Sequence, residues 1–311
     1  MSLYRRAFIS LVILGCFLWG SVLTLRALHH QHPIWKFNEK TLLVIQLNVG
    51  QGDALLIISP DRKVTLIDVG PVFGSFLRTW DAGKNVVIPT LRGLGLTRVD
   101  QIILTHHDMD HMGGILSVLK HLNIGQVFDN GRGQLSHSYQ EFKEILSDRG
   151  LPLKTLKEGD DISLGEGTLA EVLSPQAGGG LDGNNTSLVL RVTYGHFKMI
   201  VTGDIENLAE ENLCAHYGLE LKCDFLKVPH HGSKTSSSFS FLRLAQPRVA
   251  GISVGKHNSY GHPSPIILNR YARLVGRRVC RTDWDGGLLL VSNGTECFLV
   301  TEHGKSETVN L

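Results

Sequence analysis

The residues best suited to chemistry lie in one short loop between Thr105 and Gly114. Five ligand-type side chains occupy six consecutive positions there: His106, His107, Asp108, Asp110 and His111. An apolar run precedes them, and two glycines that allow a tight backbone turn follow. Neutral imidazole and carboxylate groups bind zinc, manganese or iron, and no thiolate lies in this loop. The loop therefore predicts a divalent metal site.

The loop must be positioned by the strands and helices around it. Strands are expected at 42–47, 54–58, 64–68 and 101–105, and in a second series at 169–173, 187–193, 197–202 and 225–228. Helical patterns lie at 86–94, 114–121, 138–148 and 263–274, with a further helix after Asp204. Two similar series in one chain predict an α/β protein in which two sheets face each other with helices outside, a four-layer αββα sandwich.

The 106–111 loop resembles the His-x-His-x-Asp-His signature of the metallo-β-lactamase fold superfamily, with Asp108 in place of the second histidine. Further motifs resemble, in order, the hydrolase domain of ComEC-type DNA-uptake competence proteins. These motifs are Leu66-Ile67-Asp68-Val69-Gly70, Val201-Thr202-Gly203-Asp204, Leu226-Lys227-Val228-Pro229-His230-His231-Gly232-Ser233 and Asn258-Ser259-Tyr260-Gly261-His262-Pro263. The resemblance covers roughly residues 41 to 292, and several ordered motifs are more specific than one.

The resemblance implies a metallo-β-lactamase fold and a site for two divalent ions, Zn²⁺ or Mn²⁺. The implied ligands are His106, Asp108, Asp110, His111, Asp204 and His230. The first two would hold one ion and the next two the other, with Asp204 bridging them. His231 is the second choice after its neighbour His230. Asp68 would orient a ligand imidazole, which is how such sites fix the tautomer of the ring.

The sequence departs from the pattern of the family in three ways. No histidine stands between the first cluster and Asp204 at the usual place, where Asn184 and Asn185 offer a weaker donor. One ion is therefore expected to bind loosely or through water, with Asn185 as a candidate ligand. The opening aspartate of the family is Asn48 here. ComEC-type proteins also carry many transmembrane helices, whereas this sequence contains one candidate.

Two divalent ions about 3.5–4 Å apart lower the pKa of a bridging water and clamp the oxygens of an in-line displacement. We expect Asp110 to orient that water and to accept its proton. The leaving group also needs a proton donor. Candidates are His262, Tyr260 and Lys234, of which His262 is our choice for a catalytic role.

Charge is unevenly distributed along the 311 residues. Residues 221–281 hold eleven Lys and Arg against one acidic residue, Asp224. This segment carries +10, and since the whole chain carries +2, the remainder carries −8. A basic surface near the metal loop would attract a polyanion such as single-stranded DNA. The alternative is that these side chains line ordinary exposed helix faces.

The first forty residues are predicted to lie outside the globular domain. Residues 7–25 form a run of 19 without charge after Arg5-Arg6, which favours a transmembrane anchor over a cleaved signal. We therefore expect an anchor or signal at 1–25, a linker at 26–40 and the hydrolase domain at 41–311. The domain would face the periplasm or the outside of a bacterium, and would be secreted if the segment is cleaved. Cys214, Cys223, Cys280 and Cys297 are either paired in disulfides or buried as free thiols.

These features predict a metal-dependent hydrolase, with phosphodiester cleavage during DNA uptake as the favoured reaction. Expected partners are single-stranded DNA or another phosphoester, the membrane, and proteins of the competence apparatus. One alternative is a hydrolase of the same fold that acts on small phosphoesters, lactones or thioesters. The other is a catalytically weak DNA-binding or complex-forming module, which the absent histidine favours.

Overall fold

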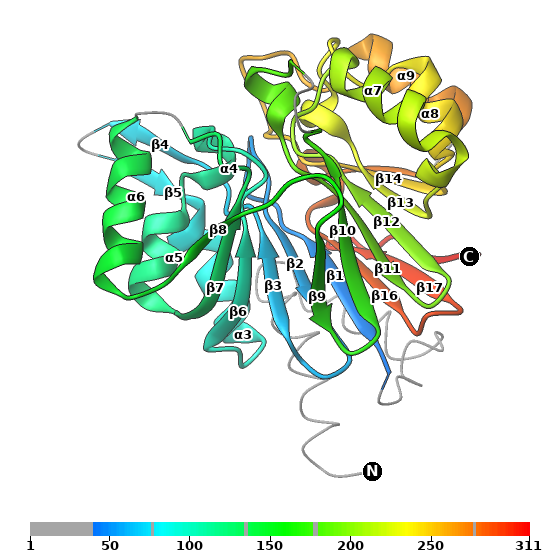
Figure 1. Ribbon diagram of the computed structural model, residues 1–311. Coiled ribbons are helices and arrows are strands. Elements are labelled where there is room, and N and C mark those ends of the chain that lie inside the picture. The colour runs from blue at the N-terminus through cyan, green and yellow to red at the C-terminus, as the bar shows by residue number, and fades with distance from the viewer. Residues whose placement is uncertain (1–39, 76–77, 134–135, 177–179, 276–277) are drawn as a thin grey trace.

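The computed structural model describes residues 40–75, 78–133, 136–176, 180–275 and 278–311 (Figure 1). The predicted anchor at 1–25 and nearly all of the predicted linker at 26–40 lie outside these residues. Of the helices that the structure describes, none combines the length and the hydropathy that crossing a bilayer requires.

The first sheet contains nine strands among the described residues, in the order β18-β17-β16-β1-β2-β3-β6-β7-β8. Its strands are β1 (Leu42–Gln46), β2 (Leu55–Ile58), β3 (Val64–Ile67), β6 (Arg98–Ile103), β7 (Asn123–Asp129), β8 (Leu153–Thr155), β16 (Leu288–Ser292), β17 (Cys297–Thr301) and β18 (Ser306–Val309). Pairing is antiparallel from β18 to β3 and parallel from β3 to β8.

The second sheet has seven described strands, in the order β15-β14-β13-β12-β11-β10-β9. They are β9 (Asp161–Gly165), β10 (Thr168–Ser174), β11 (Val189–Tyr194), β12 (Phe197–Val201), β13 (Phe225–Lys227), β14 (Val249–Ile252) and β15 (Val279–Arg281). Here β9 to β12 pair antiparallel and β12 to β15 pair parallel. A separate hairpin joins β4 (Val72–Ser75) and β5 (Arg78–Asp81).

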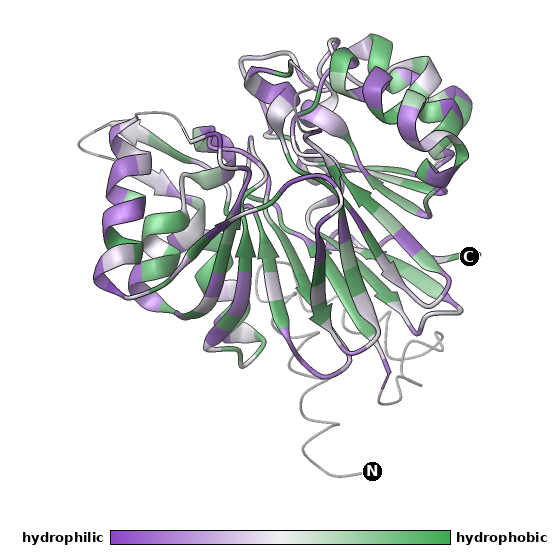
Figure 2. Ribbon diagram, in the orientation of Figure 1, coloured by the Kyte–Doolittle hydropathy of each residue, from purple (hydrophilic) through white to green (hydrophobic). Residues whose placement is uncertain are grey.

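Helices cover the outer faces of both sheets. The first sheet is covered by η2 (Gly83–Val87), α3 (Ile88–Gly93), α5 (Ile115–His121) and α6 (His137–Asp148), and the second by α7 (Asn207–Tyr217), α8 (Phe239–Ala245) and α9 (Pro265–Leu274). Three apolar clusters separate the layers, one between the two sheets and one under each set of helices. Figure 2 shows that hydrophobic residues predominate along the strands and alternate with hydrophilic residues along the helices. This is the predicted four-layer αββα sandwich.

The cysteine alternatives are resolved within this fold. Cys214, Cys223, Cys280 and Cys297 are all free thiols, and all except the partly exposed Cys214 are buried. Burial raises the pKa of the Cys280 and Cys297 thiols to about 12, so both are protonated at neutral pH. The expectation of free thiols is therefore confirmed over that of disulfides.

The parallel part of each sheet positions the residues of interest. The segments that follow the carboxyl ends of β3 and β6 in one sheet lie against those that follow β12, β13 and β14 in the other. The His231 ring, after β13, contacts Asp110, after β6. A further contact joins the two sheets here, because the Leu188 amide, just before β11, donates to the Thr105 carbonyl. Ligand sites form at the carboxyl ends of parallel strands, so this edge is where a site is expected.

Candidate metal centre

The 105–114 loop folds tightly at this edge. Asp108 is extended and precedes the single turn α4 (Met109–Met112), so Asp110 and His111 lie on that turn. The turn between β1 and β2 packs against this loop, because the Asp53 amide donates to the Asp110 carbonyl at 3.1 Å. A Cβ atom at Gly52 would overlap that same carbonyl, so only glycine allows this approach.

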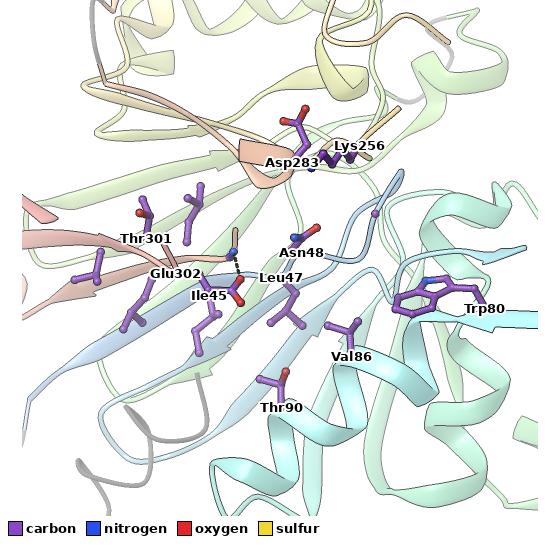
Figure 3. Close-up of a pocket in the computed structure, with 15 residues that line it drawn as sticks. Ile45, Leu47, Asn48, Trp80, Val86, Thr90, Lys256, Asp283, Thr301 and Glu302 are labelled. Atoms are coloured by element: carbon purple, nitrogen blue, oxygen red, sulfur yellow. Dashed lines mark hydrogen bonds between the residues drawn. The ribbon is translucent and has the colours of Figure 1, made fainter. Parts of the chain in front are cut away.

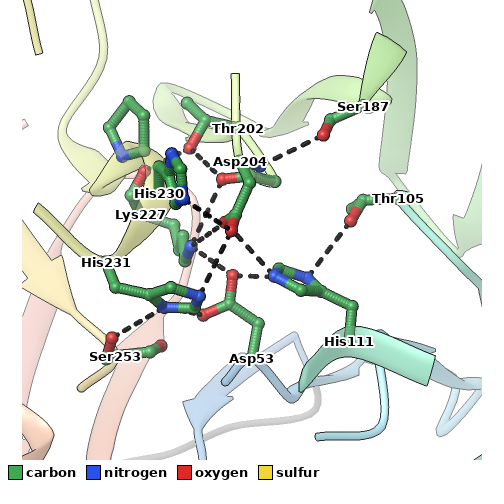
Figure 4. A network of polar contacts seen from close by, with 12 residues as sticks. Asp53, Thr105, His111, Ser187, Thr202, Asp204, Lys227, His230, His231 and Ser253 are labelled. Carbon is green, nitrogen blue, oxygen red and sulfur yellow. Dashed lines mark hydrogen bonds and ion pairs between the residues drawn. The ribbon is translucent and has the colours of Figure 1, made fainter. Parts of the chain in front are cut away.

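Four side chains from three segments meet at one point. They are Asp110, His111, Asp204 and His231, whose candidate ligand atoms all lie within 4.8 Å of one another. Asp204 joins the group, because one of its oxygens lies 3.2 Å from His111 Nε2 and the other lies 3.3 Å from His231 Nε2 (Figure 4). His231 Nε2 also contacts Asp110 Oδ2 at 3.2 Å. Two imidazoles and two carboxylates are a donor set suited to a divalent metal ion.

Asp68 lies behind His111, as the resemblance implies. Its Oδ2 accepts from His111 Nδ1 at 2.7 Å and from the Thr105 hydroxyl at 2.7 Å, while Oδ1 accepts from the Thr105 amide. This hydrogen bond fixes the proton on Nδ1 of His111, so the unprotonated Nε2 points toward Asp204. Asp68 adopts a left-handed conformation with φ of 57°, and such strain is concentrated at functional sites.

His106 and Asp108 lie beside this group and complete a candidate second ion site. The His106 ring lies 4.1 Å from the His111 ring, centre to centre, and its Nε2 lies 3.7 Å from Asp108 Oδ2. Burial, followed by the neighbouring charge of His111, holds the pKa of His106 well below its ordinary value. The ring is therefore neutral at pH 7, which is the form that binds a metal.

The residues fit a pair of divalent ions. Buried atoms without a hydrogen-bond partner are rare in proteins, yet His106 Nε2 is one here. His111 Nε2 and Asp204 Oδ1 lie 3.2 Å apart without forming a hydrogen bond. These are the atoms that a metal would bind. Although burial lowers the pKa of the His111 and His231 rings, the Asp204, Asp68 and Asp53 carboxylates around them raise it, to about 10 for His231. Bound cations would replace the protons that these carboxylates otherwise attract.

The geometry favours His231 over His230, the reverse of the sequence-based order. His231 is buried, and its Nδ1 donates to the Ser253 carbonyl at 2.9 Å, which aims Nε2 at Asp204. His230 is partly exposed, with Nδ1 3.2 Å from Glu206 and Nε2 3.8 Å from Asp204. Both residues have left-handed backbones, with φ of 47° and 52°, and this turn sends the neighbouring rings in different directions.

The side-chain oxygen of Asn185, a candidate ligand from the sequence, is engaged by backbone amides. Its side-chain oxygen accepts from the backbone amides of Glu206 and Ala209, at 3.0 and 3.2 Å, at the start of α7. The residue therefore fixes the segment that follows Asp204. The side-chain amide nitrogen of the neighbouring Asn184 lies 3.4 Å from His230 Nε2.

Two charged residues lie at the centre that the sequence did not place there, Asp53 and Lys227. Lys227 ends β13 and is buried, forming an ion pair with Asp53 and lying 3.8 Å from Asp204 Oδ1. Burial lowers the pKa of Lys227, but the Asp53 and Asp204 carboxylates raise it above its ordinary value. The available signal was a lysine at the end of an apolar strand, a position where an unpaired charge is costly.

His262 lies at the outer rim of the centre. Its ring is 5.6 Å from the His230 ring and 6.4 Å from the His231 ring, centre to centre. Burial, with the charges of these two histidines, lowers the pKa of His262 to about 4. The imidazole is therefore neutral at pH 7. Lys234, another candidate donor, is exposed.

The histidine that follows His106 belongs to a separate network. His107 Nε2 lies 3.1 Å from Asp129 Oδ2, and the Tyr139 hydroxyl donates to the same oxygen at 2.9 Å. Burial would raise the pKa of Asp129, but hydrogen bonds from His107, the Gly131 amide and Tyr139 lower it. The network ties the metal loop to β7 and α6.

Asp129 gives a pH-dependent contribution to stability. Its folded pKa lies below the unfolded value of about 3.9, so the carboxylate stabilises the fold above that pH and the contribution is lost as pH falls through the folded pKa. We expect Asp129→Asn to lower the free energy of unfolding by about 1–3 kcal/mol at pH 7. The difference from the unsubstituted protein should shrink at about pH 3.5. Urea unfolding at both pH values measures it, and a difference independent of pH would contradict the assignment.

Several basic side chains of the segment 221–281 are buried or paired with acidic residues and so do not contribute to a positive surface. Lys227 is buried, and three arginines pair with acids: Arg248 with Asp224 at 2.9 Å, Arg278 with Glu307 at 3.4 Å and Arg281 with Asp283 at 2.7 Å. Among the residues of this segment that the structure describes, the exposed basic side chains are Lys222, Lys234, Arg243, Lys256 and Arg273. The positive surface is therefore smaller than the count along the sequence suggests.

A pocket of about 360 Å³ lies away from this centre (Figure 3). It is formed between β1, β16, β17 and the η2–α3 segment, with an apolar floor that includes Leu47 and Val86. Asn48, which replaces the opening aspartate of the family, lines this pocket. None of the acidic or histidine residues of the metal centre does, so we place the chemistry at the metal centre.

The fold and the site define an α/β sandwich protein with a candidate dimetal centre of aspartate and histidine residues. Residues 47–256 match the metallo-beta-lactamase superfamily, and the chain belongs to that superfamily. Its members are generally metal-dependent hydrolases.

Two curated relatives match most of this chain, and one of them is a competence protein by name. The chain is 34% identical over 252 residues to ComE operon protein 3 of Bacillus subtilis and 33% identical over 250 residues to competence protein ComA of Neisseria gonorrhoeae. These matches cover 78% and 80% of this chain but 32% of each relative. The chain thus spans about a third of the length of these relatives.

Solved structures share the fold at low sequence identity. The metallo-beta-lactamase fold protein YhfI from Bacillus subtilis is 11% identical, with a TM-score of 0.50 over 77% of this chain and 96% of that one. CmlA, a diiron beta-hydroxylase from Streptomyces venezuelae, is 15% identical, with a TM-score of 0.50 over 79% of this chain and 53% of that one. These similarities support the fold assignment.

Proposed function

We propose that this chain is a metal-dependent phosphodiesterase that cleaves single-stranded DNA in connection with DNA uptake. The observation that carries the proposal is the position of the Asp204 carboxylate, which faces His111 with one oxygen and His231 with the other. Asp204 thereby completes the four-residue group with Asp110, and His106 and Asp108 beside this group offer donors for a second cation. The name of the relative competence protein ComA supports a link to competence, and the resemblance of the motifs to ComEC-type proteins supports the link to DNA uptake.

The two divalent ions, Zn²⁺ or Mn²⁺, would lower the pKa of a bound water and neutralise charge on the phosphoryl oxygens. His106, Asp108 and Asp204 would hold one ion, and Asp110, His111, Asp204 and His231 the other. Asp110 is partly exposed and is fixed by its contact with His231, so it can orient the attacking water and accept its proton.

His262 would act on the leaving-group side of the centre. Because its imidazole is neutral at pH 7, it can offer a hydrogen bond to the departing oxygen, whereas an imidazolium would transfer a proton more readily. We propose this hydrogen-bonding role for His262, and the departing oxygen takes its proton from a solvent water molecule.

The proposed partners follow from the same chemistry. Single-stranded DNA would be bound through its phosphates by exposed basic side chains such as Lys234 and Lys256. The apolar run at 7–25 would anchor the chain in the membrane, with the centre on the periplasmic or extracellular side. Proteins of the competence apparatus would then lie close to it.

The test is hydrolysis by the full chain, purified with Zn²⁺ or Mn²⁺, of a 20-nucleotide single-stranded DNA, bis(p-nitrophenyl) phosphate, a thioester and a lactone. We expect turnover of the two phosphodiesters, and about two bound ions per chain by mass spectrometry. His111→Ala should lower the rate by at least about 10²- to 10³-fold. His121→Ala, at an exposed histidine on α5, is the matched control and should keep the activity.

Other outcomes would contradict the proposal in distinct ways. Turnover of the lactone or thioester alone would indicate another hydrolase of the superfamily. Fewer than one ion per chain, together with DNA binding and no turnover, would indicate a binding module. Equal rates for His111→Ala and the unsubstituted chain would exclude the centre as the site of any activity observed.

A further inference from the structure

Three aromatic rings form a stack that leads outward from the metal centre. The His231 and His262 rings are stacked at 6.4 Å between centres with an interplanar angle of 28°. The Tyr260 ring stacks on His262 in turn, at 5.8 Å and 26°. The stack thus begins at a buried candidate metal ligand and ends at a side chain that is 70% exposed.

The loop that carries the outer two rings is held in place by Asn258. The side-chain oxygen of Asn258 accepts from the backbone amides of Tyr260 and His262, at 3.2 and 3.0 Å. Its side-chain nitrogen donates to the carbonyls of Gly255 and His262, at 3.0 and 2.7 Å. These four hydrogen bonds fix the loop between β14 and α9, so the Tyr260 ring is presented on an ordered backbone.

An exposed aromatic ring on a fixed loop beside a metal centre is suited to one class of ligand. A nucleobase has a flat π-face and stacks on tyrosine whatever its identity. Single-stranded nucleic acid exposes such faces, whereas the bases of a duplex are already stacked on one another. The Tyr260 ring is separated from His231 by the His262 ring, so it can contact the base of a nucleotide whose phosphate lies at the centre.

We propose that Tyr260 is a substrate-binding residue that stacks on a base of single-stranded nucleic acid next to the phosphate at the metal centre. This inference rests on the proposed phosphodiesterase function and adds how the substrate is recognised. It gives Tyr260 a role through the face of its ring and not through its hydroxyl. The preference would be for unpaired strands and would be tolerant of sequence.

The test compares Tyr260→Ala, Tyr260→Phe and the unsubstituted full chain on two substrates of equal length. One is a thymidine oligonucleotide, and the other is the same sugar-phosphate chain with abasic tetrahydrofuran units. We expect Tyr260→Ala to raise KM for the thymidine strand roughly 5- to 100-fold and to leave KM for the abasic strand unchanged. Tyr260→Phe should keep KM on both, because its ring can still stack. Phe239→Ala, at an exposed ring on α8, is the aromatic control.

Each outcome separates the inference from the function on which it rests. If the unsubstituted chain cleaves neither strand, the proposed function fails and the inference falls with it. If it cleaves both strands with the same KM, or if Tyr260→Ala changes nothing on thymidine, stacking is excluded while the function stands. If Tyr260→Phe is as impaired as Tyr260→Ala, the hydroxyl acts and the stacking role is wrong.

Discussion

Replacing His231 with asparagine is expected to remove metal from the centre and to lower the rate of hydrolysis by at least about 10²- to 10³-fold. His231 Nε2 lies 3.2 Å from Asp110 and 3.3 Å from Asp204, so its loss takes one donor from the four-residue group. His230→Asn should lower the rate only about tenfold, because His230 contacts Asp204 at 3.8 Å and is partly exposed.

Asparagine is the appropriate replacement at both positions. The two residues have left-handed backbone conformations, which alanine adopts at a cost and asparagine tolerates well. The pair of variants therefore changes the ring and keeps the turn. Metal content by mass spectrometry and steady-state rates are the measurements, and circular dichroism with thermal unfolding shows whether each variant folds.

The opposite ranking of the two variants would restore the sequence-based assignment of His230. If His230→Asn loses its metal and His231→Asn keeps it, then the centre rearranges when ions bind. Equal loss in both folded variants would mean that each ring donates to an ion.

Much of the fold could be predicted because its signals are local. The alternating β-rich and helical segments indicate two series of elements, and three ligand-bearing segments follow the strands β6, β12 and β13. Ends of parallel strands meet at one edge of a sheet, so their convergence was predictable once the sandwich was recognised. The strand β14 and the helix α8 were missed, since a four-residue strand and a seven-residue helix give weak periodic signals.

The finer details of the site depend on contacts between distant residues. The choice between His230 and His231 is made by two left-handed residues and by a hydrogen bond to Ser253, and the sequence shows neither. Asn185 was a plausible ligand by position, but its oxygen is taken by the amides at the start of α7. Lys227 was expected on a basic surface, yet it is buried against Asp53.

The buried pair of Lys227 and Asp53 explains how the centre tolerates so much negative charge. The metal centre contains five carboxylates, those of Asp53, Asp68, Asp108, Asp110 and Asp204. If two divalent cations bind, they supply four positive charges, and the Lys227 ammonium supplies the fifth. Lys227 also donates to the Gly203 carbonyl at 3.4 Å, which places its charge beside Asp204.

Lys227→Met is expected to lower the free energy of unfolding of the metal-free protein by about 3–5 kcal/mol, because it leaves Asp53 buried without its partner. Urea unfolding in EDTA measures this without stabilisation by bound ions. Asp53→Asn should also destabilise, because it leaves the ammonium unpaired. Lys154→Met, at an exposed lysine on β8, is the control for loss of one positive charge and should change stability by less than about 0.5 kcal/mol.

The double variant Lys227→Met/Asp53→Asn distinguishes a coupled pair from two independent losses. When both charges are absent, neither is left buried and uncompensated, so the double variant should be more stable than the sum of the single effects implies, by about 1.5–3 kcal/mol. A strictly additive double variant would mean that Asp53 depends on His111 and His231 for compensation, since each has Nδ1 3.7 Å from that carboxylate. In that case Lys227 would act mainly on Asp204, and its removal should alter metal affinity more than folding.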